Sequence, residues 1–142
     1  SLDLLCRVTA IFVAQAVTPT EFDGRVGLLN GVPLYAGNYC MAKCHWQIYC
    51  HYDSGMIRCG LVDTIPIYQV PRVVLDTAIK AANLIGKGLY GVDLKMVDDK
   101  AYVIEINDNP SIDHELEDAI IGDEMYYRLL NHFEQALEMK HY

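Results

Sequence analysis

The chain has 142 residues, which suits a single domain spanning 1–142 with enough length for a hydrophobic core. Hydrophobic residues make up 52% of it, which argues against intrinsic disorder. A net charge of −8 argues against a nucleic-acid binder, and no apolar run reaches the roughly 20 residues of a membrane span.

The N-terminal residues 1–17 are apolar but lack the basic start and the small-residue cleavage site of a signal peptide. The chain also begins without Met, so we expect a fragment that starts inside a larger protein. An odd number of cysteines in such a chain predicts reduced thiols and a cytoplasmic location. The cysteines are Cys6, Cys40, Cys44, Cys50 and Cys59.

The first half of the chain has the short alternating runs and turn residues that are typical of strands. The stretch from 60 to 71 carries Pro66 and Pro71 and is predicted to be irregular. The predicted elements are a buried strand at 12–17, a turn at 18–24, a hairpin of 25–30 and 32–42 turning at Asn30-Gly31, a strand at 45–52 and a loop at 53–55.

The second half changes to helical periodicity after Pro71. A helix is predicted to run to Ile85 and to stop at Gly86, and it is followed by a hairpin of 89–97 and 101–107. A last helix is predicted from about Asp123 to Met139. Its apolar stripe would be Tyr126, Leu129, Leu130, Phe133 and Leu137. This order predicts an α+β fold with an antiparallel sheet and packed helices.

The second predicted hairpin carries polar residues among its apolar ones, and packing of a core does not require polar residues there. Side chains at i and i+2 of a strand share a face, so Glu105 and Asn107 point the same way. A two-residue turn would set Asp93 opposite Ile104, whereas a three-residue loop would set Asp93 opposite Glu105. We favour the three-residue loop, because it sends one set of apolar side chains to a common core face. That set is Leu94, Met96, Tyr102 and Ile104.

The Cβ atoms of two directly opposed residues lie about 4.5–5.5 Å apart, and like charges there are unfavourable. A positive group must therefore accompany Asp93 and Glu105. Lys95 is one candidate, and Mg²⁺ (or Mn²⁺) is a better one, because Asn107 can add a neutral carbonyl ligand. The alternative is a solvated sheet face whose acidic groups only favour solubility.

Two stretches resemble a known family. "GVDLKMVDDKAYVIEINDNPSID" resembles the metal-binding hairpin of ATP-grasp ligases, which place an Asp on one strand and Glu-x-Asn on the next. Upstream, "VAQAVTPTEFDGRVGLLNGVPLYAGNYCMAKCHWQIY" resembles the nucleotide-side segment of RimK-like ATP-grasp ligases, the glutathione synthase and ribosomal-protein-modification type. The resemblance covers nearly the whole chain.

The resemblance implies roles for individual residues. Asp93, Glu105 and Asn107 would hold Mg²⁺ that bridges the phosphates of ATP, and Arg25 would face the transferring phosphoryl group. The nucleotide would contact Asp23 and the backbone of Ala16 and Val17. Ala16 departs from the family, which commonly has Glu after the glutamine at this place.

The resemblance also implies an activity and shows what the chain lacks. The fold would be the C-terminal portion of an ATP-grasp domain, since no glycine-rich flap with its lysines is present. The activity would be ATP-dependent joining of a small carboxylate to an amine, either an amino acid, a peptide or a protein tail, through an acyl phosphate. The portion alone would be inactive, and its uncovered apolar surface could cause self-association.

Two other functions stay open at the level of sequence. An ATP-grasp relative could bind nucleotide and metal without turnover. Alternatively, Cys40 and Cys44, four residues apart, could begin a structural Cys/His metal site.

Overall fold

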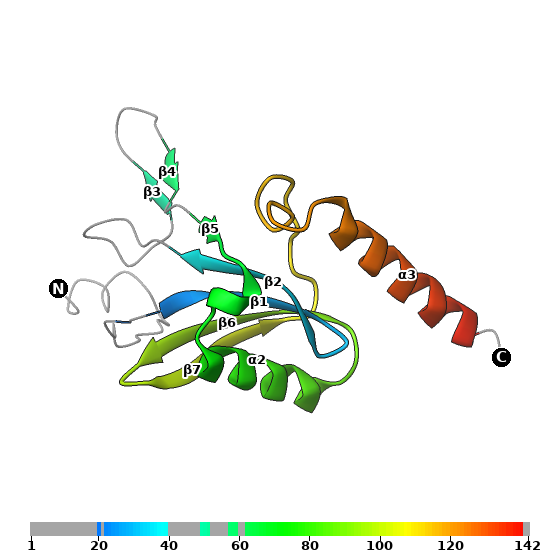
Figure 1. Ribbon diagram of the computed structural model, residues 1–142, viewed down its shortest axis with the longest axis horizontal. Helices are drawn as coiled ribbons and strands as arrows, with labels where there is room; N and C mark the ends of the chain where they lie inside the picture. The colour runs from blue at the N-terminus through cyan, green and yellow to red at the C-terminus, as the bar shows by residue number, and fades with distance from the viewer. Residues whose placement is uncertain (1–19, 21, 40–48, 52–56, 60–61, 141–142) are drawn as a thin grey trace, which may run out of the picture.

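The computed structural model describes residues 20, 22–39, 49–51, 57–59 and 62–140, and Figure 1 shows how their elements are arranged. The strands are β1 (Phe22–Leu29), β2 (Val32–Tyr39), β3 (Tyr49–His51), β4 (Ile57–Cys59), β5 (Val62–Thr64), β6 (Leu89–Val97) and β7 (Lys100–Asn107). The helices are the short 3-10 helix η1 (Ile67–Gln69), α2 (Arg72–Ile85) and α3 (Asp123–Lys140).

Five strands form one antiparallel sheet in the order β5-β2-β1-β6-β7, and β3 pairs with β4 separately. Helix α2 lies across one face of the large sheet (Figure 1). The start of α3 packs on the opposite face, where Met125 and Leu129 meet Leu34 and Tyr35. The predicted α+β class with an antiparallel sheet and packed helices is thereby confirmed.

The first hairpin follows from its turn residues. Asn30 (φ 55°) and Gly31 (φ 78°) both adopt the left-handed conformation that a two-residue hairpin turn requires. Leu29 therefore pairs with Val32, as the sequence predicts. The predicted turn at 18–24 is wrong at its end, because β1 already begins at Phe22, whose side chain is buried in the core.

Helix α2 has the predicted bounds. Pro71 precedes its first residue, and its last turn ends at Gly86 (φ 143°), a conformation that glycine adopts readily. Val74, Ala78 and Ala82 recur every four residues and are fully buried against the sheet. Small side chains at these positions let the helix approach the sheet closely. The opposing sheet residues are Val26, Leu28, Val92 and Leu94.

The second hairpin differs from prediction in its loop and agrees in its pairing. Its turn has two residues, Asp98 (φ 49°) and Asp99 (φ 58°), and Val97 pairs with Lys100. The three-residue loop is therefore wrong. Asp93 nevertheless lies opposite Glu105, because the register shifts between Asp93 and Leu94, and Ile104 becomes the extra residue of a β-bulge on β7.

The bulge also changes which side chains reach the core. Leu94 pairs with Val103 and Met96 with Ala101, on the face covered by α2. Tyr102 is 52% exposed and Ile104 is 58% exposed, so the predicted common core face of Leu94, Met96, Tyr102 and Ile104 is wrong.

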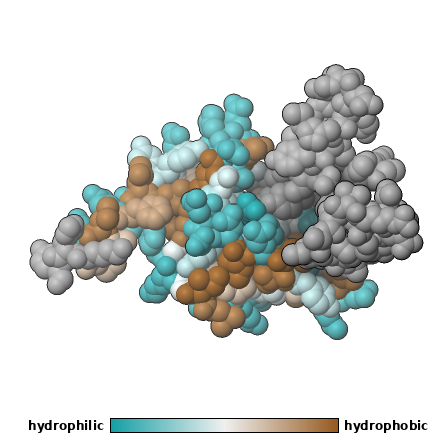
Figure 2. Space-filling view, turned by 180° about the vertical axis from the view of Figure 1, so that it is seen from behind, coloured by the Kyte–Doolittle hydropathy of each residue, from teal (hydrophilic) through white to brown (hydrophobic). Residues whose placement is uncertain are grey.

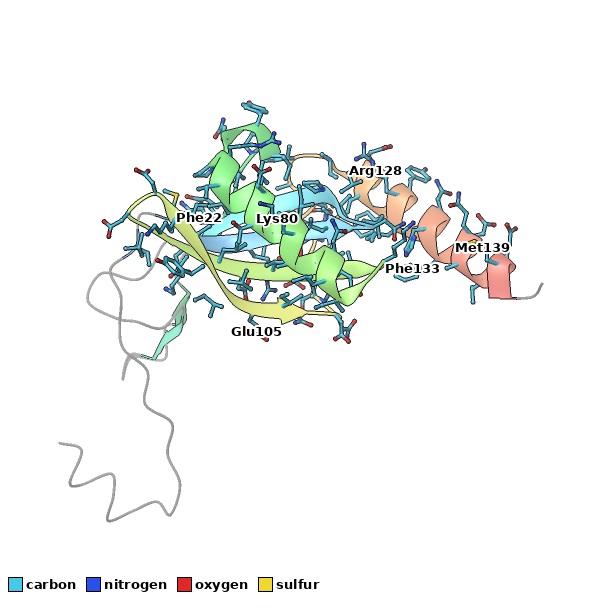
Figure 3. The ribbon with its side chains drawn as sticks, turned by 90° about the horizontal axis from the view of Figure 1, so that it is seen from below. Phe22, Lys80, Glu105, Arg128, Phe133 and Met139 are labelled. Atoms are coloured by element: carbon cyan, nitrogen blue, oxygen red, sulfur yellow. The ribbon has the colours of Figure 1, made fainter. Side chains whose placement is uncertain are left out.

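The C-terminal helix forms where predicted, and of its predicted apolar stripe Leu129 is buried and Tyr126 half-buried, whereas the residues farther along are exposed. Met125 and Leu129 are the buried residues of α3. Leu130 (66% exposed) and Leu137 (61% exposed) face solvent, and Phe133 is also exposed. Figures 2 and 3 show the reason: the helix runs outward from the sheet, and apolar side chains lie along its projecting part.

Several predictions fall outside the described residues. They concern the strand at 12–17, the loop at 53–55 and the cysteines Cys40 and Cys44. Of the predicted strand at 45–52, residues 49–51 are described and form β3. The predicted irregular stretch at 60–71 contains β5 and η1. No helix in the described part of the chain is long and apolar enough to cross a membrane.

Candidate functional site

A row of directly paired residues crosses the sheet on the face opposite α2. Thr64 pairs with Gly37, Gly37 with Arg25, Arg25 with Asp93, and Asp93 with Glu105. Directly paired residues of antiparallel strands point to the same face. Five strands thus bring a hydroxyl, a guanidinium and two carboxylates into one row of the sheet, with Gly37 between the hydroxyl and the guanidinium.

Arg25 and Asp93 form the centre of this row. The Arg25 Nε donates to Asp93 Oδ1 at 2.7 Å, and Nη2 donates to Oδ2 at 2.9 Å. Both side chains are 20% exposed, so the pair is largely shielded from water. Such bidentate pairing is stronger and more directional than a single ion pair. Arg25 thus supplies a positive group beside Asp93, whereas Lys95 pairs with Asp23.

A glycine makes room for the Arg25 side chain. A Cβ at Gly91 would lie 2.9 Å from the Cβ of Pro110 and 3.2 Å from the Cδ of Arg25. Pro110 is buried and follows the polar run at the end of β7. Arg25 and Pro110 therefore both lie over the backbone of β6, which fixes the guanidinium against Asp93 and holds the chain that leaves β7.

Asp23 and Lys95 make a second pair in the next row. Their backbones pair between β1 and β6, and the Lys95 ammonium donates to the Asp23 carboxylate. The side chain of Asp23 is more buried than that of Lys95. Asp23 thus lies on the same face as Arg25, two residues away along β1. The other predicted nucleotide contacts, Ala16 and Val17, lie outside the described residues.

Glu105 and Asn107 continue the predicted metal set on β7. Glu105 is exposed near the β7 edge of the sheet (Figure 3). Asn107 pairs with Gly91, which places it on the same face, and its Oδ1 accepts the Asn109 N–H at 2.8 Å. The structure therefore brings Asp93, Glu105 and Asn107 to one face, two of them directly opposed.

Oxygen donors of this kind suit Mg²⁺, which is commonly bound through one or two carboxylates. Both Asp93 oxygens accept hydrogen bonds from Arg25. A metal that binds through Asp93 would thus require Arg25 to release at least one of them. Within the described residues, no three His, Cys, Asp or Glu side chains are grouped so as to hold a metal ion. The donor set therefore consists of two carboxylates and one amide carbonyl.

Tyr35 lies beside this polar row and was not predicted from the sequence. It pairs with Gly27, and a Cβ at Gly27 would lie 2.1 Å from the Tyr35 ring, so the ring covers that glycine. Its hydroxyl is buried and has no hydrogen-bond partner within the described part of the chain. Burial raises the pKa of Tyr35 to about 12, while nearby Arg25 acts in the opposite direction.

A second polar cluster lies in the segment between β7 and α3. The buried Asp118 carboxylate accepts hydrogen bonds from His114 Nδ1 (2.8 Å), Tyr126 Oη (2.9 Å) and the Glu115 N–H (2.7 Å). The hydrogen bond to Asp118 raises the pKa of His114, and the same bond lowers the pKa of Asp118. His114 itself is exposed. The i, i+4 spacing of His114 and Asp118 is a signal that sequence reasoning could have used.

The described cysteines, Cys50 and Cys59, lie on the short β3–β4 ladder. Cys50 pairs with Arg58, His51 with Ile57, and Cys59 with Tyr49, so no Cys or His on β3 lies directly opposite another on β4.

Comparison of the chain with protein-family models found no match, and comparison with curated proteins found none.

Proposed function

We propose that the chain is the C-terminal portion of an ATP-grasp domain and that its complete protein joins a carboxylate to an amine with Mg²⁺ and ATP. One observation carries the proposal: Asp93 and Glu105 oppose each other on a sheet face where Arg25 stands on the adjacent strand. A folding role alone does not require this. An ATP-consuming reaction and reduced thiols both agree with a cytoplasmic location.

The reaction consists of two balanced displacements. A carboxylate oxygen attacks the γ-phosphorus of ATP, the bond to the β,γ-bridging oxygen breaks, and ADP leaves. The amine nitrogen then attacks the acyl carbon, inorganic phosphate leaves, and the nitrogen loses a proton as the amide forms. Such chemistry depends on positioning and on neutralising phosphate charge, and no side-chain nucleophile is needed.

The residues on this face would have different roles in the reaction. Mg²⁺ held by Asp93, Glu105 and Asn107 would supply positive charge to the β- and γ-phosphate oxygens. Arg25 carries a planar, permanently charged donor fork that matches phosphoryl oxygens. Asp23, held by Lys95, would face the nucleotide side, with Ala16 and Val17 at the adenine edge.

A second candidate is a nucleotide- and metal-binding module without turnover. The tight pairing of Arg25 with Asp93 favours it over the ligase, because a guanidinium held by both Asp93 oxygens leaves Glu105 and Asn107 to hold a metal and is itself kept from a transferring phosphoryl group.

The complete protein that contains this chain provides the test. ADP release is measured with ATP, Mg²⁺ and a panel of amino acids as carboxylate and amine, and the amide product is identified by mass spectrometry. We expect amine-dependent ADP release that Glu105→Gln lowers by at least about 100-fold and that Glu138→Gln, an exposed change on α3, leaves unaltered. Nucleotide binding without amine-dependent ADP release would reject the ligase and support the module.

A further inference from the structure

An apolar pocket of about 240 Å³ lies on the same sheet face as the Arg25–Asp93 pair. Its walls come from β2, from β5 and the residues after it, and from the segment between β7 and α3. The lining that matters here is Leu34, Tyr35, Ile65, Ile67, Glu117 and Ile120. The volume lies below the roughly 300–1,000 Å³ of typical ligand pockets, so it suits one small group.

The pocket adjoins the polar row through a glycine. Thr64 belongs to the pocket lining, and its partner Gly37 pairs in turn with Arg25. Because Gly37 has no side chain, none stands between Thr64 and Arg25 in that row. A ligand held at Thr64 would lie two strands from Arg25, with no side chain of that row between them.

The segment that closes the pocket is held in place by hydrogen bonds. Thr64 Oγ1 donates to the Leu116 carbonyl at 2.5 Å, and the Asp113 N–H donates to Glu117 Oε2 at 2.8 Å. These contacts fix Glu117 and the neighbouring apolar side chains against β5. The pocket is thus built by defined contacts and not by a loose loop.

Glu117 gives the pocket its charge preference. It is the single ionisable carboxylate of the lining, and the other lining side chains are apolar apart from Thr64, Tyr35 and Tyr68. Tyr35 and Glu117 both line the pocket, and Glu117 raises the pKa of Tyr35 while Arg25 lowers it. An ammonium beside Glu117 would be attracted to the carboxylate.

We propose that this pocket is the amine subsite and that it selects a small primary amine with an aliphatic side chain, such as an aliphatic amino acid or its amide. The aliphatic group would occupy the space among Ile65, Ile67 and Ile120, and the ammonium would lie at Glu117. The role as amine subsite rests on the proposed ligase function, whereas the ligand preference comes from the lining itself.

Leucinamide is the probe, and binding to the complete protein is measured without ATP by calorimetry and by the methyl NMR signals of isoleucine. We expect binding that shifts the signals of Ile65, Ile67 and Ile120. Glu117→Gln should weaken it about tenfold, since the amide keeps an acceptor for Asp113 but loses the charge. 4-Methylpentanamide, which lacks the amine, should bind Glu117→Gln and the unmodified protein equally. Glu138→Gln serves as the control.

Three results would overturn the subsite: no leucinamide binding at 10 mM, equal affinity in Glu117→Gln, or signal shifts only at other isoleucines. Ile120→Lys gives an independent check at an exposed position, because a cation at the mouth should repel the ammonium and weaken binding. Binding is measured without turnover, so it is separate from ADP release. If the protein releases ADP with other amines but does not bind leucinamide, the proposed ligase function stands and the proposed subsite is rejected.

Discussion

Arg25 explains how two carboxylates can face each other across β6 and β7. Opposed like charges destabilise a strand pair, and a guanidinium bound to one of them offsets that cost. Gly91 contributes to the same arrangement, because any side chain there would meet Arg25 and Pro110. The polar face thus depends on a few residues whose roles become visible only when β1 is placed beside β6.

Replacing Arg25 with Gln should lower the free energy of unfolding by about 1–3 kcal/mol, because Asp93 would keep its shielded position without its charged partner. Urea denaturation measures the change. Arg72→Gln is the matched control, since Arg72 and Asp76 form an exposed pair on α2 that contributes about 0.5 kcal/mol or less. Equal losses in the two variants would show that the Arg25 pair contributes no more than a surface pair.

The β6–β7 hairpin combines two features that exclude each other in a regular hairpin. It has a two-residue turn, and it also pairs Asp93 with Glu105. The two-residue turn alone would have set Asp93 opposite Ile104. The bulge at Ile104 restores the pairing with Glu105. Loop length could be weighed from the sequence, but the bulge could not, because it depends on packing against β6 and α2.

The turn itself offers a stability test. Asp98 and Asp99 both have positive φ, a conformation that glycine adopts at little cost and alanine does not. Asp99→Gly should raise the free energy of unfolding by about 0.5–1 kcal/mol, whereas Asp99→Ala should lower it by a similar amount. Thermal and urea denaturation measure both variants. If the main effect were relief of repulsion between the two aspartates, both variants would be more stable than the unmodified chain.

The segment before α3 should make stability depend on pH. The raised pKa of His114 means that its contribution is complete below about pH 6.5 and is lost as pH rises through that raised pKa. The lowered pKa of Asp118 means that its contribution is present above pH 3.8 and is lost as pH falls through the lowered pKa. The contribution of these two groups to stability should therefore be greatest between about pH 3.8 and pH 6.5.

Urea midpoints at about pH 5.5 and pH 8.5 provide the measurement. The midpoint of the unmodified chain should fall between the two, and His114→Asn should reduce that fall by removing the titrating partner of Asp118. An unchanged pH dependence in this variant would mean that His114 does not contribute through Asp118.

At the scale of the whole molecule, acidic charge and exposed apolar surface oppose each other. The net charge of −8 makes copies repel, while Leu130, Phe133 and Leu137 lie uncovered along the outward part of α3 (Figure 2). Salt screens the repulsion over about 8 Å at 0.15 M and leaves apolar attraction in place.

We therefore expect self-association that increases between about 20 mM and 300 mM salt, as measured by sedimentation velocity. The double variant Leu130→Lys, Leu137→Lys should remain monomeric throughout. Asn131→Lys, Gln135→Lys adds the same charge on the same helix without removing apolar side chains and should still associate. A monomer at every salt concentration would contradict the expectation.

How much of this molecule the sequence predicts depends on how local each feature is. The Asn30-Gly31 turn and the bounds of α2 depend on neighbouring residues and are predicted well. Periodicity predicts the apolar side of α3 but not how much of that side is covered: Leu129 is buried, whereas Leu130 and Leu137 are exposed. The Arg25–Asp93 contact and the pocket beside Gly37 join segments that are far apart in the chain, so no local sequence pattern predicts them.

The irregular residue on β7 has a further effect at the border of the sheet. In the described sheet β7 is an outer strand, and an outer strand offers unpaired amide and carbonyl groups to a strand of another molecule. Inserting Ile104 interrupts the even spacing of those groups and increases the local twist. A feature that brings two acidic side chains together thereby also makes this border a poor template for fibril growth.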